Sequence, residues 1–485
     1  MQVRTHAAPL SRLEADVLIL GVPEKGLTER LKEADAAAGG AIALAMGPQF
    51  KGKAEETETL FPVQGLGAPR VVLVGLGEKP LDAESWRRVV SAGVEAARGR
   101  ARRLAIALPE GLDAAVAAEG AAEAALLSAY EFHPYRTEQD PDEIAIEELI
   151  LVGASAEAAE RGAALARAVS WVRDLSNMPG NKLGVGDLVG QARDLAKSHG
   201  LAIHVIEGED LVKEGLRLVH AVGRGSEMPP AFVTLEYRGA GKDAPVVALV
   251  GKGVTFDTGG INIKPRAGME EMKTDMHGAA TVLGVMRVAS ERKLPVNLVG
   301  VMAIAENMPN GNATVPGDVV KAYNGLTVEI VDTDAEGRLI LADSLAYTVK
   351  NYRPEVVIDL ATLTGSIIMA LAYEASGLFT NSDSLAAALT AAGEATGERY
   401  WRMPIWDVYA EQVRSPIADL RNIGKEKGDA IHAAKFLQNF VGETPWAHLD
   451  IAGPSWISEP KPYRPKGSTG VGVRSLIHWL EQRPR

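Results

Sequence analysis

Two short segments of the chain hold most of the side chains that could perform chemistry. They span residues 251–275 and 332–339, and both are rich in glycine and charged residues. Carboxylates crowded into one place repel each other unless positive charge lies among them, and hard divalent metal ions are the usual partners of such oxygen-rich sites. We therefore predict a site for two metal ions, equipped for hydrolysis. The ionisable side chains of the two segments are Asp257, Asp275, Asp334, Glu336, Lys252, Lys264 and Arg338.

The elements that must position these side chains follow from the apolar pattern of the second half of the chain. Short apolar runs alternate there with segments of helical periodicity. This alternation predicts an α/β fold with a mostly parallel central sheet covered by helices. Ligands bind beyond the carboxyl ends of such strands, and both chemical segments begin just after a predicted strand. The expected strands are residues 246–250, 296–301, 327–331, 356–360 and 447–451, and the helices between them include residues 275–293 and 342–351.

The length of 485 residues exceeds what one ordinary hydrophobic core supports, so we expect two domains. Residues 1–155 are predicted to form a smaller N-terminal α/β domain. Residues 156–180 are predicted to be a linking helix and turn, and residues 181–485 the larger catalytic domain with the dinuclear metal site. Within the N-terminal domain the expected strands are residues 16–20 and 70–74, and the expected helices are residues 28–38, 84–104 and 114–129.

The composition narrows the class of protein. A net charge of −12 argues against a general nucleic-acid binder. The absence of cysteine excludes disulfides, thiolate ligands and a cysteine nucleophile. No serine-hydrolase elbow or zinc-protease helix motif is present. With neither a signal-peptide pattern nor an apolar run long enough for a bilayer, the chain is expected to be cytoplasmic, with no membrane partner.

Asp334, Glu336 and Arg338 are spaced by two residues and follow an apolar run. If the backbone stays extended, all three side chains leave the same face and Arg338 faces the metal cavity. Taken alone, an ordinary solvated turn explains this spacing equally well. A calcium loop is a third alternative, because Asp332 and Asp343 occupy its first and twelfth positions; the strand-like segment before it argues against that loop, which needs a helix there.

Three further residues have two interpretations each. Asp275 could be the N-cap of the following helix or a metal ligand. Lys252, between two glycines, could anchor an anion or, beside a metal, lose its proton and ligate through nitrogen. Lys264 could be a surface lysine or an electrophile directed at a carbonyl oxygen.

The two segments resemble motifs of the cytosolic leucyl aminopeptidase family, the dinuclear-metal exopeptidases. The matching motifs are residues 251–265, 272–276 and 333–339, and the last of these is highly specific. The similarity covers most of residues 170–480, whereas the N-terminal domain is only loosely similar. Supporting stretches are residues 176–181, 223–226, 359–365 and 446–453.

The resemblance implies two metal sites that share ligands. Asp257 and Glu336 would bridge the two ions, Lys264 and Arg338 would be the catalytic residues that bind no metal, and Arg338 would hold a bicarbonate. The first ion would be held by Lys252, Asp257, Asp275 and Glu336, and the second by Asp257, Asp334 and Glu336. The substrate would contact Met272, Thr362, Leu363, Gly365 and Ala452.

The implied function is a metal-dependent aminopeptidase that releases leucine and other N-terminal residues from peptides with a free N-terminus. The ions would be Mn²⁺ or Zn²⁺, with Mg²⁺ or Co²⁺ as alternatives, and the assembly a homohexamer. A dipeptidase or cysteinylglycinase would use the same residues, and a bifunctional relative would also bind DNA. The chain departs from the family at Asp332, where asparagine is usual, and at His277, where glycine is usual; neither position is an implied ligand.

Overall fold

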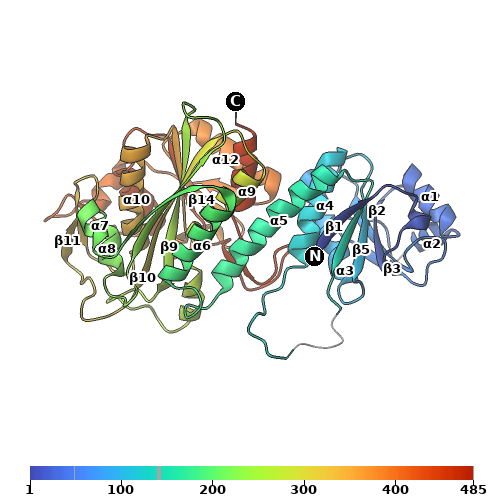
Figure 1. Ribbon diagram of the computed structural model, residues 1–485, viewed down its shortest axis with the longest axis horizontal. Helices are drawn as coiled ribbons and strands as arrows, with labels where there is room; N and C mark the ends of the chain where they lie inside the picture. The colour runs from blue at the N-terminus through green and yellow to red at the C-terminus, as the bar shows by residue number, and fades with distance from the viewer. Residues whose placement is uncertain (48–49, 139–143, 484–485) are drawn as a thin grey trace. The chain divides into compact units, whose positions relative to one another are not determined.

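The computed structural model describes residues 1–47, 50–138 and 144–483, and the chain divides into two compact units (Figure 1). The first unit comprises Met1–Ser170 and Glu459–Lys466, and the second comprises Trp171–Ser458 and Gly467–Arg485. Helix α5 (Ala156–Asn177) runs across the boundary between them. Within the described residues, no helix combines the length and the apolar character that a membrane span requires.

The first unit is built on a six-stranded sheet in the order β1-β6-β5-β2-β4-β3. Every neighbouring pair is parallel except β3 and β4. The helix expected over residues 84–104 is too long, because α3 ends at Ala97 and Gly99 adopts a φ of +69°, which a helix cannot continue. The elements are β1 (Gln2–His6), η1 (Leu10–Arg12), β2 (Val17–Pro23), α1 (Glu29–Ala37), α2 (Ala41–Ala45), β3 (Thr57–Leu60), β4 (Arg70–Gly77), α3 (Ala83–Ala97), β5 (Arg103–Ala107), α4 (Ala114–Ser128) and β6 (Glu148–Val152).

The second unit contains an eight-stranded sheet in the order β15-β14-β17-β13-β9-β10-β8-β7. Its four central strands, β17, β13, β9 and β10, run parallel to one another, which confirms the predicted α/β class. The strands are β7 (Ala202–Glu207), β8 (Ala231–Arg238), β9 (Val246–Asp257), β10 (Asn297–Asn307), β13 (Val356–Ala361), β14 (Ser376–Thr380), β15 (Tyr400–Arg402) and β17 (Trp446–Asp450).

Helices and short strands complete this unit. A small sheet has the order β11-β12-β16, and β18 pairs with β19. These short strands are β11 (Asp318–Lys321), β12 (Thr327–Ile330), β16 (Leu420–Arg421), β18 (Trp456–Ile457) and β19 (Gly467–Ser468). The helices are α6 (Val185–His199), α7 (Asp210–Glu214), α8 (Arg217–Gly223), η2 (Met269–Thr274), α9 (His277–Glu291), α10 (Gly337–Tyr352), α11 (Gly365–Leu371), α12 (Asp383–Thr396), η3 (Asp407–Val413), α13 (Asp429–Gln438) and α14 (Val473–Glu481).

The central strand β9 is longer than predicted. The sequence suggested that it ends at Val250, before a glycine-rich stretch, but β9 continues to Asp257. The glycines are required by packing: a Cβ on Gly251 would lie 2.5 Å from the backbone oxygen of Gly278 in α9. Lys252 and Asp257 therefore stand on a central strand and not in the loop after it.

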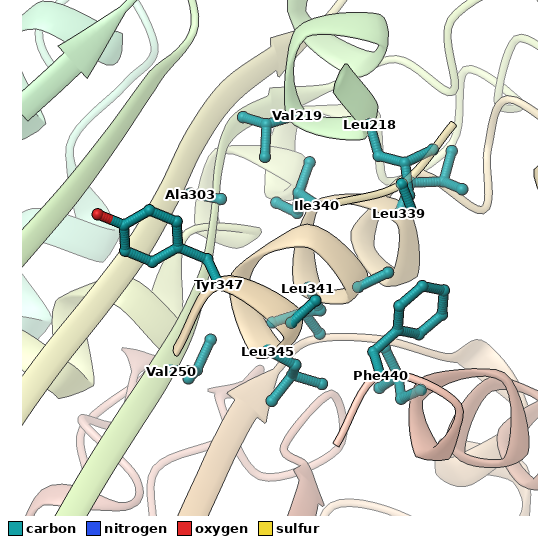
Figure 2. Close-up of a cluster of buried hydrophobic side chains, with 14 of the residues drawn as sticks. Leu218, Val219, Val250, Ala303, Leu339, Ile340, Leu341, Leu345, Tyr347 and Phe440 are labelled. Atoms are coloured by element: carbon teal, nitrogen blue, oxygen red, sulfur yellow. The ribbon is translucent and has the colours of Figure 1, made fainter. Parts of the chain in front are cut away.

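Helix α10 is fixed by the hydrophobic core (Figure 2). Its residues Leu339, Leu341 and Leu345 are at most 1 % exposed and belong to the same core cluster as Val250 of β9. Burial of each such side chain contributes roughly 1.5–3 kcal/mol. The start of α10 is therefore held rigidly beside β9, and the residue that precedes it, Glu336, is held with it.

Candidate metal centre

The site lies where the central parallel strands end. Asp257 is the last residue of β9, Asn307 the last of β10 and Asp450 the last of β17, while Thr362 follows β13 directly. Since these four strands are neighbours and parallel, their carboxyl ends meet at one edge of the sheet. This is the edge at which α/β sheets bind ligands.

Lys252 reaches this edge from within β9. Its Nζ lies 2.7 Å from Asp275 Oδ2 and 2.8 Å from Glu336 Oε1, and it donates a hydrogen bond of 3.0 Å to the carbonyl of Thr362. The side chain is buried, and glycine makes room for it, because a Cβ on Gly337 would lie 2.8 Å from Lys252 Nζ. The lysine thus joins carboxylates that arrive from two separate segments.

Lys264 holds a second pair of carboxylates. Its Nζ lies 2.8 Å from Asp257 Oδ2 and is also in contact with an oxygen of Asp334. The loop that carries Lys264 turns back sharply at Gly259, which has a φ of +86°, and closes with a hydrogen bond of 2.8 Å from the Lys264 amide to the Thr258 carbonyl. Of the two alternatives for Lys264, the structure favours the one that directs it into the site.

Asp334 and Glu336 are carried by the segment between β12 and α10. The predicted extended backbone is wrong, because Glu336 already has helical angles and α10 begins at Gly337. Arg338 lies within the first turn of that helix, so its side chain does not leave on the same face as the two carboxylates.

Arg338 is buried and bonded away from the carboxylates. One terminal nitrogen donates to the carbonyl of Asn422 at 2.9 Å, and the other lies 2.8 Å from Asp429 Oδ1. Its Nε is buried and has no hydrogen-bond partner among the described residues. Arg338 is not among the residues that line the main cavity of this site, and its catalytic role stays a prediction.

Asp275 is not the N-cap of α9. Met276 occupies that position without a side-chain capping bond, and Asp275 closes the preceding 3₁₀ helix η2. Its carboxylate is turned toward the site, where Oδ1 accepts a hydrogen bond of 2.7 Å from the Thr362 hydroxyl. The structure therefore excludes the capping interpretation, and the carboxylate points into the site.

Three of the carboxylates could share a cation. Asp257, Asp334 and Glu336 each offer an oxygen, and these oxygens lie within 4.8 Å of one another. Four carboxylates against two lysines leave an excess of negative charge in a largely buried place, which is costly without a further cation. Glu336 Oε2 is buried and has no hydrogen-bond partner in the part of the chain that the structure describes. Both observations fit a divalent metal ion.

The pKa values express the same crowding. Burial, together with the charges of Asp257 and Asp275, raises the pKa of Glu336 to about 8 despite the two lysines. Burial also raises the pKa of Asp275 to about 6. Burial alone would lower the pKa of Lys252, but Asp275, Glu336 and Asp257 outweigh it and raise the pKa. In the protein by itself, protons and lysines supply the positive charge that the carboxylates require.

A cavity of about 510 Å³ opens beside the carboxylates. Every residue for which a ligand, substrate or catalytic role was predicted lines it, with the exception of Arg338. These lining residues are Lys252, Asp257, Lys264, Met272, Asp275, Asp334, Glu336, Thr362, Leu363, Gly365 and Ala452. Such a volume lies within the usual range for small-ligand sites.

The calcium-loop alternative fails on two observations. The segment before the loop, Thr327–Ile330, is strand β12, whereas an EF-hand requires a helix there. The residue at the twelfth position, Asp343, is directed elsewhere: its oxygens accept the backbone N–H groups of Leu218 and Tyr323 at 2.7 and 2.8 Å.

Three buried residues of the site were missed by sequence reasoning. Asn307 donates to Asp257 Oδ1 at 2.8 Å and to the Thr333 carbonyl at 3.1 Å. Asp450 accepts from the amide of Leu363, and Asn422 binds the segment before α10. Asp450 lies in residues 446–453, a stretch that resembles the family, and this resemblance could have indicated it. No sequence pattern indicated the two asparagines.

Comparison with known proteins identifies the family. The model of the catalytic domain of the cytosol aminopeptidase family matches residues 170–477, and the model of its N-terminal domain matches residues 19–139. The chain belongs to the cytosol aminopeptidase family. It is therefore a metal-dependent aminopeptidase, a hydrolase of peptide bonds, as the resemblance of its motifs implied.

Relatives of the aminopeptidase match along its whole length. The "Probable cytosol aminopeptidase" of Geobacter sp. (strain M21) is 44% identical over 487 residues, covering 99% of this chain and 98% of the relative. That of Roseiflexus castenholzii is also 44% identical, with 98% of each chain covered.

Two solved structures share the fold of this aminopeptidase. The bottromycin maturation enzyme BotP in complex with Mn has a TM-score of 0.87 at 37% identity, covering 96% of this chain and 99% of that one. A mutant of tomato leucine aminopeptidase has a TM-score of 0.88 at 33% identity, covering 100% and 97%.

Proposed function

We propose that the aminopeptidase holds two divalent metal ions at the carboxyl edge of its central sheet. The observation that carries this proposal is the convergence of oxygens from Asp257, Asp334 and Glu336 within 4.8 Å, together with the unpartnered Glu336 Oε2. One ion would be held by Lys252, Asp257, Asp275 and Glu336, and the other by Asp257, Asp334 and Glu336. Two bound ions supply an activated water and polarise the scissile carbonyl.

The substrate is a peptide with a free N-terminus. A free N-terminal amine would offer a nitrogen ligand to one of the two ions, which a peptide blocked at that end lacks. The first side chain would rest against Met272 and Ala452, which line the cavity. Backbone groups of the segment from Thr362 to Gly365, which also lines the cavity, would orient the peptide.

Lys264 stabilises the charge that develops on the substrate. Its ammonium group lies beside Asp257 and Asp334 and lines the cavity. In the protein without metal, burial by itself lowers the pKa of Lys264, but the charges of Asp257 and Glu336 raise it overall. A preorganised donor to an oxyanion is worth roughly 3–4 kcal/mol.

One atom of Arg338, its Nε, supports a bicarbonate site at this residue. The terminal nitrogens of Arg338 are bonded to Asn422 and Asp429, but Nε is a buried donor without a partner, which a small anion would satisfy. A bicarbonate held there would offer a proton acceptor beside Arg338, two residues along the chain from Glu336.

The metals are Mn²⁺ or Zn²⁺. Carboxylate ligands without histidine favour Mn²⁺, and the nitrogen of Lys252 adds a ligand type that Zn²⁺ also accepts. The structural neighbour BotP is described in complex with Mn. Mg²⁺ and Co²⁺ are the alternatives.

We also propose that the aminopeptidase acts as a homohexamer in the cytoplasm. Support for assembly comes from large apolar side chains that are more than half exposed in one stretch of the second unit, which burial between subunits would cover. They are Trp401, Trp406, Val408 and Ile417. DNA binding and a dipeptidase specialisation gain no support from any observation.

The test is elemental analysis of the purified protein combined with hydrolysis of a leucine anilide. The expected result is about two metal ions per chain, loss of activity after chelation, and recovery with Mn²⁺ or Zn²⁺. Comparison of leucine amide with dipeptides then distinguishes an aminopeptidase from a dipeptidase. A protein that cleaves the anilide at full rate without metal would contradict the proposal.

A further inference from the structure

Asn422 is a buried residue that contacts the segment carrying two proposed metal ligands. We call this segment, residues 331–336, the ligand turn. Asn422 is 0 % exposed and directly follows strand β16, and its backbone amide donates to the Glu329 carbonyl at 3.1 Å. Its side chain therefore enters the protein beside the ligand turn from a strand about 90 residues further along the chain.

Both the oxygen and the nitrogen of the Asn422 side-chain amide are hydrogen-bonded to the ligand turn. Its oxygen accepts the backbone N–H of Val331 at 2.8 Å and that of Asp332 at 3.3 Å. Its nitrogen donates to the carbonyl of Asp332 at 2.6 Å and to that of Ala335 at 3.3 Å. An amide is the side-chain group that combines a two-lone-pair acceptor with two donors, so one residue satisfies groups of both kinds.

These bonds matter because the ligand turn has no regular secondary structure of its own. Buried backbone groups without partners are costly, so a turn beside a metal site needs partners from elsewhere in the protein. Asn307 supplies one more, to the Thr333 carbonyl, but Asn307 also touches the carboxylate of Asp257. Within the described residues, the hydrogen bonds of Asn422 reach none of the four carboxylates.

The backbone carbonyl of Asn422 contacts a second functional group. It accepts a hydrogen bond of 2.9 Å from Arg338, two residues beyond Glu336. A displacement of Asn422 would therefore shift the ligand turn and the guanidinium of Arg338 together.

We infer that Asn422 is a positioning residue that sets the metal affinity of the site. It acts through the backbone of the ligand turn, by fixing the segment from which Asp334 and Glu336 extend. This inference rests on the proposed metal centre. Outer partners of metal ligands typically change metal affinity by 10–100-fold when removed.

A purely structural role must be distinguished from this one, because Asn422 also adjoins the small sheet. Asp419 provides the matched control. It lies two residues before β16 ends and binds the same neighbouring strand at its opposite end, where its Oδ2 accepts the amide of Thr327 at 2.8 Å and the hydroxyl of Thr327 at 2.7 Å. Asp419→Ala thus removes side-chain bonds between the same two strands without touching the ligand turn.

The experiment compares Mn²⁺ binding by the wild type, Asn422→Ala, Asn422→Ser and Asp419→Ala after the metals have been stripped from each protein. Free Mn²⁺ is measured by electron paramagnetic resonance, and anilide hydrolysis is followed over the same titration. For the Asn422 variants we expect the dissociation constant of the weaker ion to rise by roughly 10–100-fold. Turnover at saturating Mn²⁺ should return to within a few-fold of wild type, and Asp419→Ala should bind Mn²⁺ like the wild type.

Unchanged Mn²⁺ affinity in the Asn422 variants would overturn the inference, as would an equal loss in Asp419→Ala. If the Asn422 variants are unfolded without metal, saturating Mn²⁺ should restore their circular dichroism, because a ligand that binds the folded state stabilises it. Failure of that rescue would also overturn the inference. If the proposed metal centre itself is wrong, the wild-type protein will bind no Mn²⁺, and this outcome is distinct from those above.

Discussion

Replacement of Lys264 by methionine tests the division of the site into metal ligands and catalytic groups. Methionine approximates the length of the side chain but removes the ammonium group that lies between Asp257 and Asp334. If Lys264 stabilises the oxyanion, its loss should reduce turnover by roughly 10²–10³-fold, equivalent to about 3–4 kcal/mol. Since Lys264 is a cation competing for the same carboxylates, its removal should leave metal affinity unchanged or increase it.

The assay requires both quantities from one preparation. Metal content is measured by elemental analysis and turnover by anilide hydrolysis at saturating substrate, with the wild type purified in parallel. Lys264 is 21 % exposed at its side chain and lines the cavity, so methionine there should not disturb the core. A variant that has lost metal would show that Lys264 is a ligand, and a variant with full turnover would show that it stabilises no transition state.

Gly337, the bound metal and the His448–Asp359 pair can each be tested separately. Gly337→Ala should weaken Mn²⁺ binding, because the new Cβ would lie 2.7 Å from Lys252 Cε and displace that lysine; a Mn²⁺ titration measures this. Chelation should lower the melting temperature and Mn²⁺ should restore it, since bound metal stabilises the folded state; calorimetry with and without metal decides. Burial alone lowers the pKa of His448, but Asp359, 2.6 Å away, raises it overall. Asp359→Asn should therefore lower the free energy of unfolding by roughly 3 kcal/mol at about pH 6 and by less at about pH 9. Urea unfolding at the two pH values measures this difference.

The sign of the last prediction follows from linkage. A histidine whose pKa is higher in the folded state adds stability below its unfolded pKa of about 6.5. That stability is lost as the pH rises through the folded value. An equal cost of Asp359→Asn at both pH values would show that the pair is not charged.

Much of the fold could be predicted because it depends on local pattern. The central strands are buried apolar runs, and the helices between them have helical periodicity, so both were found near their true positions. Glycine was the main source of error. In β9 it suggested that the strand ends at Val250, whereas Gly251 and Gly253 allow helix and strand to approach closely.

The clustering of the candidate site residues could be predicted from the sequence, but their conformations could not. The two segments contain the charged groups, and their clustering in sequence survives in space. The start of α10 decides whether Asp334, Glu336 and Arg338 share a face. The helix begins at Gly337, earlier than predicted, and its leucines are buried in the core. Arg338 consequently contacts Asn422 and Asp429.

The buried asparagines that contact the site could not be predicted from the sequence, for a different reason. Asn307 and Asn422 act through hydrogen bonds to backbone groups far away in the chain, and an isolated asparagine has no distinctive spacing. Asn422 is bonded to residues about 90 positions earlier, a relation set by the pairing of β16 with β12. Such contacts become visible once the tertiary fold is known.

The most direct test of the account is anomalous diffraction from crystals of the aminopeptidase soaked in Mn²⁺. We expect two anomalous peaks in the cavity, both within coordination distance of Asp257 and Glu336, with Lys252 Nζ beside one of them. A single peak, or two peaks that share neither carboxylate, would contradict a dinuclear centre built from these residues.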